Sequence, residues 1–285
     1  MILAAGFGTR LLPITKAQPK EMLPLVDRPI IHFAVEEAVA SGIEQIIIVT
    51  SQGKRSVEDY FDRSRDVEAI LERRGDREAL ARLRRISDMA NIAYVRQQEM
   101  LGIGNAVLTA RHLIDDEPFV LFLPDDVMVG DPPVTAQLLD VFEATGRSVV
   151  AVEEVPESET SSYGIVAGDA IDDRLTKLTR LVEKPKPEDA PSHLGIVGRY
   201  VFTQSVFDAI DRTSHGHGGE IQITDAMQIL ADEEGMYSCR VAGDRYDTGR
   251  PLSLLIASIA MGLKRPDIAP ELRRYLRGLD LSNEA

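Results

Sequence analysis

The sequence has little cysteine, no long apolar run and no excess of positive charge. Its single cysteine, Cys239, has no partner for an internal disulfide, and an isolated thiol is a poor metal site, so we expect a core residue in a reducing compartment. No uninterrupted apolar stretch approaches the roughly 18 residues of a spanning helix, and no basic segment with a signal-like apolar run opens the chain. These absences predict a cytoplasmic protein with no membrane partner.

The charge balance is acidic, with a formal net charge of -14 over 285 residues. Nucleic acids and anionic membranes carry phosphate charge, and proteins that bind them need a basic surface. We therefore predict neither partner. Any phosphate that this protein binds must be met by a local cluster of cations. The acidity is equally compatible with a salty habitat or with a need for solubility.

The pattern of apolar residues is typical of an α/β protein. With 44% hydrophobic and 27% charged residues, the chain can bury a substantial core. Short β-branched runs alternate with helical stretches, which predicts a Rossmann-like, mostly parallel mixed sheet flanked by helices. Strands are expected at residues 1–4, 45–50, 92–96, 119–123, 148–153, 163–167, 178–183 and 197–202. Helices are expected at residues 29–41, 103–113, 133–145, 204–212, 224–234 and 252–263.

One segment interrupts that alternation. Residues 57–89 are helical in pattern but densely charged, which predicts an exposed helical excursion that serves either as a solvated face or as a subunit contact. No internal repeat or low-complexity linker divides the chain, so we expect one domain over residues 1–285. The first strand is very short, which is compatible with a native start a few residues upstream.

A glycine-rich loop follows the first strand. Gly6 and Gly8 lie in the string AAGFGTR at residues 4–10, where small residues let the backbone approach a ligand and aim N–H groups at phosphate oxygens. Two glycines are also common in an ordinary tight turn. The string is not a Walker motif, because no Lys-Ser or Lys-Thr pair follows it, and it lacks the third glycine of a dinucleotide fingerprint.

The continuation of this loop favours a phosphate site. Arg10, Lys16 and Lys20 share one segment with Pro13 and Pro19, in a chain that is otherwise acidic. Proline stiffens a loop, and a stiff cationic loop is preorganised for a polyphosphate. Each cation alone would be an ordinary surface charge. The combined string predicts a cradle for phosphate.

Acidic side chains follow the apolar strand expected at residues 119–123. Asp125 comes directly after it, where a ligand crevice opens at the carboxyl ends of parallel strands. Its carboxylate suits Mg²⁺, which prefers one or two carboxylates together with phosphates. The alternative is an aspartate that caps the next turn. Asp126 is the competing ligand, and we rank it second, as a first-turn or cap residue.

Two further groups of side chains attract attention. Lys184 and Lys186 flank Pro185 in a stiff segment, which would hold one ammonium towards a phosphate, although an ordinary loop with exposed lysines has the same pattern. His215 and His217 suggest a metal site. We reject that reading because no carboxylate or cysteine has matching spacing.

Taken together, these strings resemble the sugar-nucleotide pyrophosphorylases, and within them the bacterial UTP:glucose-1-phosphate uridylyltransferases. The likeness begins with AAGFGTRLLP at residues 4–13 and PKEMLPLV at residues 19–26. Later strings follow in the family's order over nearly the whole chain: RQ (96–97), GIGNAV (102–107), LPDD (123–126), YGIV (163–166), VEKPK (182–186), IVGRY (196–200), EIQITDA (220–226) and YDTG (246–249).

The resemblance implies a nucleotidyltransferase of GT-A-like fold, with a mainly nucleotide-binding half at residues 1–130, a mainly sugar-phosphate-binding half at 131–250, and C-terminal helices at 251–285 that are a candidate contact in a homo-oligomer, a dimer or tetramer. It implies UTP and glucose 1-phosphate as substrates, UDP-glucose and pyrophosphate as products, and Mg²⁺ as the metal.

The resemblance also implies a role for individual residues. The residues expected to bind the nucleotide are Ala5, Gly6, Gly8, Thr9, Glu21, Gln97 and Gly102, with Glu21 and Gln97 at the base edges. Those expected to act in catalysis are Arg10, Lys20, Asp125 and Lys184. Metal ligation is expected from Asp125 and Asp247. Glucose 1-phosphate is expected to contact Gly164, Glu183 and Lys184.

Three alternatives stay open at this point. A thymidylyltransferase would use the same sugar phosphate, and a non-catalytic paralogue would bind nucleotide and regulate a partner. Retention of every charge expected at the reacting centre argues against the paralogue. A dehydrogenase is the weakest alternative, because Lys16 to Lys20 interrupt the register that its first βαβ unit needs.

Overall fold

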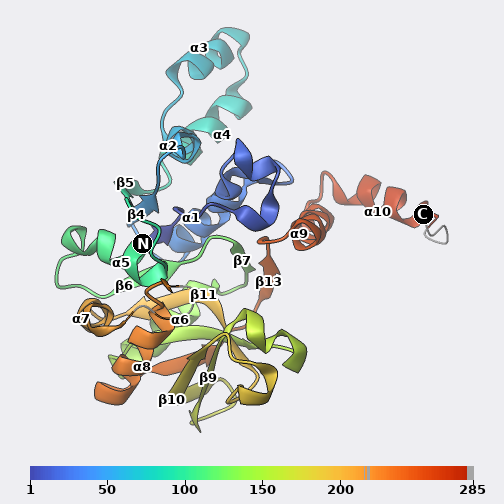
Figure 1. Ribbon diagram of the computed structural model, residues 1–285. Coiled ribbons are helices and arrows are strands. Elements are labelled where there is room, and N and C mark those ends of the chain that lie inside the picture. Colours follow the sequence, from blue (N-terminus) through green and yellow to red (C-terminus); the bar gives the residue numbers. More distant parts are fainter. Residues whose placement is uncertain (215, 217–218, 281–285) are drawn as a thin grey trace.

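The computed structural model describes residues 1–214, 216 and 219–280 of the chain and has an α/β architecture (Figure 1). Its strands are β1 (Ile2–Leu3), β2 (Pro24–Leu25), β3 (Arg28–Pro29), β4 (Gln45–Thr50), β5 (Asn91–Arg96), β6 (Phe119–Phe122), β7 (Asp126–Val129), β8 (Val149–Glu154), β9 (Gly164–Ala170), β10 (Leu175–Glu183), β11 (Leu194–Phe202), β12 (Tyr237–Arg240) and β13 (Asp244–Asp247). Its α-helices are α1 (Ile30–Ala40), α2 (Arg55–Phe61), α3 (Arg65–Arg74), α4 (Arg77–Ser87), α5 (Ile103–Thr109), α6 (Val134–Thr145), α7 (Ser205–Arg212), α8 (Ile223–Glu233), α9 (Pro251–Lys264) and α10 (Ala269–Arg277).

A nine-stranded sheet in the order β5-β4-β1-β6-β11-β8-β12-β10-β9 forms the centre of the molecule. Its first four strands run parallel, as the sequence predicted. Strand β11 is antiparallel to both β6 and β8, so the sheet is mixed beyond β6. Two small ribbons accompany it, β13 with β7 and β2 with β3.

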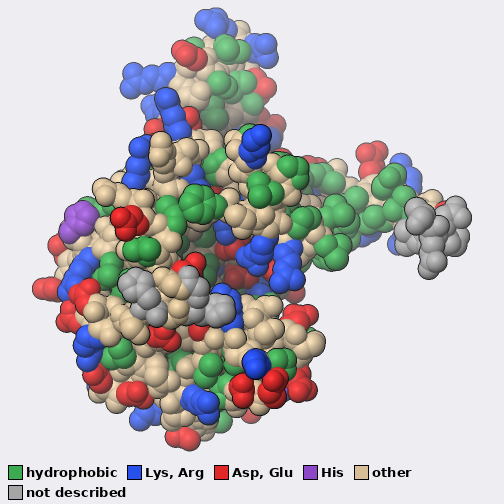
Figure 2. Space-filling model, viewed as in Figure 1, with side chains coloured by type: hydrophobic (Ala, Val, Ile, Leu, Met, Phe, Trp, Pro, Cys, Tyr) green, Lys and Arg blue, Asp and Glu red, His purple; other side chains and the backbone are tan. Residues whose placement is uncertain are grey.

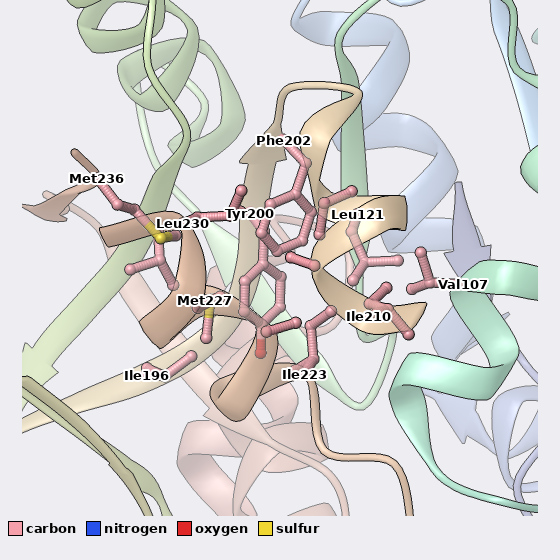
Figure 3. Close-up of a cluster of buried hydrophobic side chains, with 14 of the residues drawn as sticks. Val107, Leu121, Ile196, Tyr200, Phe202, Ile210, Ile223, Met227, Leu230 and Met236 are labelled. Carbon is pink, nitrogen blue, oxygen red and sulfur yellow. The ribbon is translucent and has the colours of Figure 1, made fainter. Parts of the chain in front are cut away.

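Alternation along the strands divides the core between the two faces of this sheet. Leu121 of β6 points into a cluster with side chains of α5, α7 and α8, part of which Figure 3 shows around Tyr200 and Phe202. Its neighbours Val120 and Phe122 point into a second cluster, beneath α1 and α6. Because successive strand residues face opposite sides, both faces of an apolar strand must be covered by helices.

Turn residues set the ends of several helices. Helix α1 begins after Pro29 and is followed by Gly42, whose φ is 85°, and α6 is followed directly by Gly146, whose φ is 63°. These left-handed conformations suit glycine, which has no Cβ to clash. The side chain of Asp76 caps α4 by accepting a hydrogen bond of 3.0 Å from the backbone N–H of Ala79.

Two parts of the chain project from this body (Figure 1). Helices α3 and α4 form most of the charged excursion predicted at residues 57–89, but its first residues lie in α2, where Val57 and Phe61 are buried in the core. Helices α9 and α10 form an arm at the C-terminal end, with hydrophobic side chains along it in Figure 2. A third apolar cluster, which includes Leu23, Ile30 and Val127, lies beneath α9. Within the described residues, no helix is both long and apolar enough to span a membrane.

Most of the expected elements are confirmed within a few residues, and Cys239 is buried as predicted. The expectation that Asp126 begins or caps a helical turn is wrong: Asp126 opens strand β7 and pairs with Asp247 of β13. The short strands β7, β12 and β13 had no predicted counterpart. His215 and His217, for which we rejected a metal site, lie outside the described residues.

Candidate active site

The parallel part of the sheet brings distant loops to one edge. Strands β1, β4, β5 and β6 run in the same direction, so the residues that follow them meet at their carboxyl ends. Ala5 follows β1, Lys54 follows β4, Gln97 follows β5 and Asp125 follows β6. The edge of the sheet therefore gathers candidate ligand-binding groups from four separate segments.

The glycine-rich loop is held firmly at its base and open at its tip. The carbonyl oxygen of buried Ala5 accepts a hydrogen bond of 2.8 Å from Ser51 Oγ. Gly8 has a φ of 66°, and Thr15 Oγ1 donates to its carbonyl oxygen at 2.9 Å. A methyl group added at Gly6 would meet no atom within 4 Å. The backbone at Gly6 thus faces open space, and Thr9, which begins the 3-10 turn η1 (Thr9–Leu11), is exposed.

Two cations of this loop converge on Asp125. Lys20 Nζ donates to Asp125 Oδ2 at 2.7 Å, and Arg10 Nη2 lies 3.9 Å from the same oxygen. Burial opposes ionisation of Lys20, but the Asp125 and Glu21 carboxylates outweigh it and raise the Lys20 pKa. Burial would likewise raise the pKa of Asp125, yet Lys20 holds it below its ordinary value. Both groups are therefore charged at neutral pH.

Strand β13 places a second carboxylate and a clamp beside Asp125. Thr248 donates to the Asp125 carbonyl oxygen through its backbone N–H and through Oγ1, both at 2.8 Å. Asp247 Oδ1 accepts from the Gly249 N–H at 2.7 Å. A methyl group added at Gly249 would lie 2.9 Å from Asp247 Oδ1 and 3.0 Å from Arg10 Nη2, so these groups lie around one point.

The carboxylates at this point form an incomplete metal site by themselves. In the part of the chain that the structure describes, no three His, Cys, Asp or Glu side chains are grouped so as to hold a metal ion. Magnesium commonly uses one or two carboxylates and takes its remaining ligands from water and phosphate. Asp125 and Asp247 fit that kind of site, in which the substrate supplies oxygens.

A buried ion pair that the sequence did not predict lies next to Lys20. Lys54 Nζ donates to Glu21 Oε2 at 2.7 Å, and both side chains are buried. Burial raises the pKa of Glu21 and lowers that of Lys54, each against the attraction of the other. The second carboxylate oxygen, Glu21 Oε1, is buried and has no hydrogen-bond partner among the residues that the structure describes. An unpaired buried acceptor is costly and calls for a functional explanation.

Gln97 and Gly102 lie where β5 leads into α5. Gln97 is 5% exposed, and its backbone N–H donates to Thr50 O at 2.9 Å. Gly102 has a φ of 98°, and an added methyl group would lie 2.8 Å from Glu220 Cβ and 2.9 Å from the carbonyl oxygen of Ile221. Only glycine fits there.

The residues predicted for the sugar phosphate are also adjacent. Gly164 of β9 pairs with Glu183 of β10, and Glu183 Oε2 accepts a hydrogen bond of 2.6 Å from Thr224 Oγ1. Lys184 Nζ lies 3.2 Å from Glu183 Oε1. Lys184 has a φ of 45°, uncommon for a residue with a Cβ, and its N–H donates to Tyr163 O at 3.0 Å. Backbone strain of this kind gathers at ligand sites.

Arg245 links this group to the Asp125 region. Its guanidinium donates to Asp126 Oδ1 at 2.8 Å and to the Tyr163 hydroxyl at 3.0 Å, and it also binds Glu153. Asp126 is thus engaged by Arg245, while burial raises the pKa of Asp126. Tyr163 directly precedes Gly164. Arg245 could not be predicted as part of this site, because its three partners come from distant segments of the chain.

A second buried arginine braces the turn that carries Asp125. Arg199 of β11 binds the Glu37 carboxylate of α1, with a shortest distance of 2.8 Å. The same guanidinium donates to the carbonyl oxygens of Leu123 at 3.0 Å and Asp126 at 2.8 Å. The residues on either side of Asp125 are therefore fixed to the interior of the protein.

Comparison with known proteins gives consistent matches. The family model described as nucleotidyl transferase matches residues 1–262. The chain is similar to a UTP–glucose-1-phosphate uridylyltransferase of Bacillus subtilis strain 168, at 47% identity over 97% of this chain and 93% of that one. It is also similar to a solved UDP-glucose pyrophosphorylase complexed with UDP-glucose, at 42% identity and a TM-score of 0.85, over 93% of this chain and 98% of that one.

A further solved structure extends the match. The UTP-bound UGPase from Acinetobacter baumannii is 35% identical to this chain, with a TM-score of 0.91 and 98% of each chain covered. These likenesses extend over nearly the full length of the chain.

Proposed function

The chain belongs to the nucleotidyl transferase family, and from this premise we propose that it transfers a uridylyl group from UTP to glucose 1-phosphate, giving UDP-glucose and pyrophosphate. The observation that carries the proposal is the convergence of Arg10 and Lys20 on Asp125, beside a glycine loop with open space above it. Arg10 and Lys20 thus bring two cations to one edge of the sheet in an acidic protein, where a triphosphate needs positive charge.

The chemistry of the reaction matches these groups. A phosphate monoester has a second pKa near 6, so the attacking sugar phosphate is mostly a dianion at neutral pH and needs no general base. The barrier lies in bringing two anions together and in stabilising charge on the α-phosphoryl oxygens, so positioning and cations dominate. Arg10 and Lys20 would bind the triphosphate, and Lys184 would bind the phosphate of the sugar.

We propose Asp125 as the main ligand of Mg²⁺, with Asp247 as the second. When bound, the ion would neutralise phosphate charge and orient the triphosphate. Among the described residues, no third His, Cys, Asp or Glu joins Asp125 and Asp247 in a metal-binding group, which suits an ion that shares its ligands with a nucleotide. Glu183 would accept hydrogen bonds from sugar hydroxyls, and Thr224 holds it in place.

The experiment that tests this proposal is a panel of nucleoside triphosphates with glucose 1-phosphate, with and without Mg²⁺, followed by pyrophosphate release. We expect turnover with UTP and magnesium, and little with ATP, GTP or CTP. A strong preference for dTTP would make the protein a thymidylyltransferase. Nucleotide binding without pyrophosphate release would support a non-catalytic paralogue. Either result would overturn the proposal.

We also propose a homo-oligomer, a dimer or tetramer, that uses the arm. Leu252, Leu255 and Ile256 form one face of α9, and Leu252 and Leu255 are 70% and 58% exposed. Grouped apolar side chains at a surface mark an interaction site. Light scattering of the intact chain and of a Leu252→Asp, Leu255→Asp double variant tests this, and a wild-type monomer would contradict it. The cytoplasmic location expected from the sequence stays a prediction.

A further inference from the structure

We propose that Asn105 is a positioning residue for base selection: it holds the Gln97 amide so that its carbonyl oxygen is the atom presented to the base, which favours uracil over cytosine. The inference rests on the proposed function in one respect, since it takes Gln97 to lie against the base of the nucleotide. Asn105 lies on α5, one helical turn beyond Gly102, and no role was predicted for it.

Gln97 has little freedom to rotate. Its side chain is 5% exposed, and its amide nitrogen Nε2 donates to Asn105 Oδ1 at 2.8 Å and to the Gly102 carbonyl oxygen at 3.4 Å. A primary amide has two N–H groups, and here each has an acceptor. The Nε2 end of the side chain is therefore saturated by the protein.

The Gly102 carbonyl oxygen, at 3.4 Å, and the closer Asn105 Oδ1, at 2.8 Å, together set which end of the Gln97 amide faces inward. Amide oxygen and nitrogen are similar in size, so their assignment follows from the hydrogen-bond network. A backbone carbonyl can only accept, and turning Gln97 around would place two oxygens against each other. Asn105 then completes the arrangement by presenting its own oxygen to the second N–H. No donor among the described residues contacts Gln97 Oε1, which is left free for a ligand.

A free oxygen at this position distinguishes the two pyrimidines. Uracil carries an N–H at N3, which can donate to Gln97 Oε1. Cytosine has a lone pair at N3, so the two acceptors would face each other. A site built around one hydrogen bond rejects a ligand that cannot make it, because the polar group is left unpaired. Thymine has the same N3–H as uracil, so this device does not separate UTP from dTTP.

The test is the ratio of kcat/KM for UTP to that for CTP in the variant Asn105→Leu. Leucine removes the acceptor and frees the Gln97 amide to turn, so we expect the ratio to fall about tenfold or more, the equivalent of one hydrogen bond. Asn105→Asp keeps an acceptor and should keep the ratio within about twofold. Thr109→Ala, on the same helix, loses only a bond to the Asn105 backbone and should also keep the ratio.

The outcomes separate this inference from the proposed function. If Asn105→Leu lowered kcat/KM for UTP and for CTP by the same factor, Asn105 would have a merely structural role, and the inference would be overturned. Calorimetric titration of the same variants gives the ratio of the binding affinities for UTP and CTP, which needs no turnover. An inactive protein would therefore refute the proposed function while the Asn105 inference is still tested. Wild-type protein that binds CTP as tightly as UTP would overturn the inference. Asn105→Ala serves if the leucine variant does not fold.

Discussion

Glu21 and Glu68 are two carboxylates with almost no exposed surface, 1% and 4%, and their surroundings shift their pKa values in opposite directions. Glu68 in the excursion accepts hydrogen bonds from Arg63 and Arg84, which lower its pKa to about 2. Glu21 in the site pairs with one buried lysine, its other oxygen has no partner in the described part of the chain, and burial raises its pKa.

The difference reflects what each region has to do. In the excursion, the charged side chains pair with one another, and both oxygens of Glu68 accept hydrogen bonds from arginines. The site has to keep hydrogen-bonding capacity for a ligand, so its groups remain incompletely paired in the protein alone. Incomplete pairing costs stability, and functional sites are where proteins tolerate that cost.

The largest expected difference between the two regions is in activity. Lys20→Met removes a cation from the phosphate cradle and should lower kcat/KM for UTP by about 10³-fold, since such charges act where negative charge develops. Arg84→Met removes a cation from the excursion and should leave kcat/KM within about twofold. Steady-state pyrophosphate release measures both. Similar losses in the two variants would erase the distinction between the regions.

The next effect is on stability. Lys54→Met leaves the Glu21 carboxylate buried without its partner and should lower the free energy of unfolding by about 3 kcal/mol, the lower end for a broken buried pair because Lys20 also faces Glu21. Arg63→Met should lower the free energy of unfolding much less, because Arg84 still binds Glu68. Urea unfolding measures both.

Adding Glu21→Gln to Lys54→Met removes the buried charge and should restore most of the loss. A double variant no more stable than Lys54→Met would contradict this account of the pair.

The smallest effect is a difference in the sign of pH dependence. Folded Glu68, with a pKa of about 2 against an ordinary 4.5, binds fewer protons than the unfolded chain, so its stabilisation is present above pH 4.5 and lost as pH falls towards 2. Glu21 has a raised pKa, so its contribution is most favourable in acid and declines as pH rises through that pKa.

Glu68→Gln should therefore flatten the acid limb of the curve of unfolding free energy against pH. The free energy of unfolding of Glu21→Gln should rise relative to that of the wild type as pH rises from 4.5 towards neutrality. Urea unfolding at each pH gives both curves, and a common sign for the two variants would show that pairing does not distinguish these carboxylates.

Much of the fold was predictable because its buried strands are apolar enough to be recognised alone. The run at residues 45–50 has no polar face and forms β4 within the sheet. The strands that were missed are all short, and two of them are rich in polar residues: β12 reads YSCR and β13 reads DRYD. They form because neighbouring strands offer hydrogen bonds, which is tertiary context that a local pattern does not contain.

The site was predictable where it follows the edge of the parallel strands. Asp125 and the glycine loop meet there, as that rule requires. Lys54 follows β4 at the same edge and could have been found by the same reasoning. The contacts of Arg245 and Arg199 could not be predicted, because their partners lie far away in the sequence and no local motif indicates the pairing. The roles assigned to the site residues stay predictions.

The antiparallel junction of β6 and β11 has a mechanical consequence. One sheet runs without a break from β5, beside the candidate nucleotide site, to β9, which carries Gly164. Arg199 of β11 binds Glu37 of α1 and so fixes this junction to the helix. A hinge between the two ends of the sheet would have to break the hydrogen bonds between adjacent strands. We therefore expect the two ends to move as one rigid body. Any closing over substrate therefore falls to segments that lie outside this sheet.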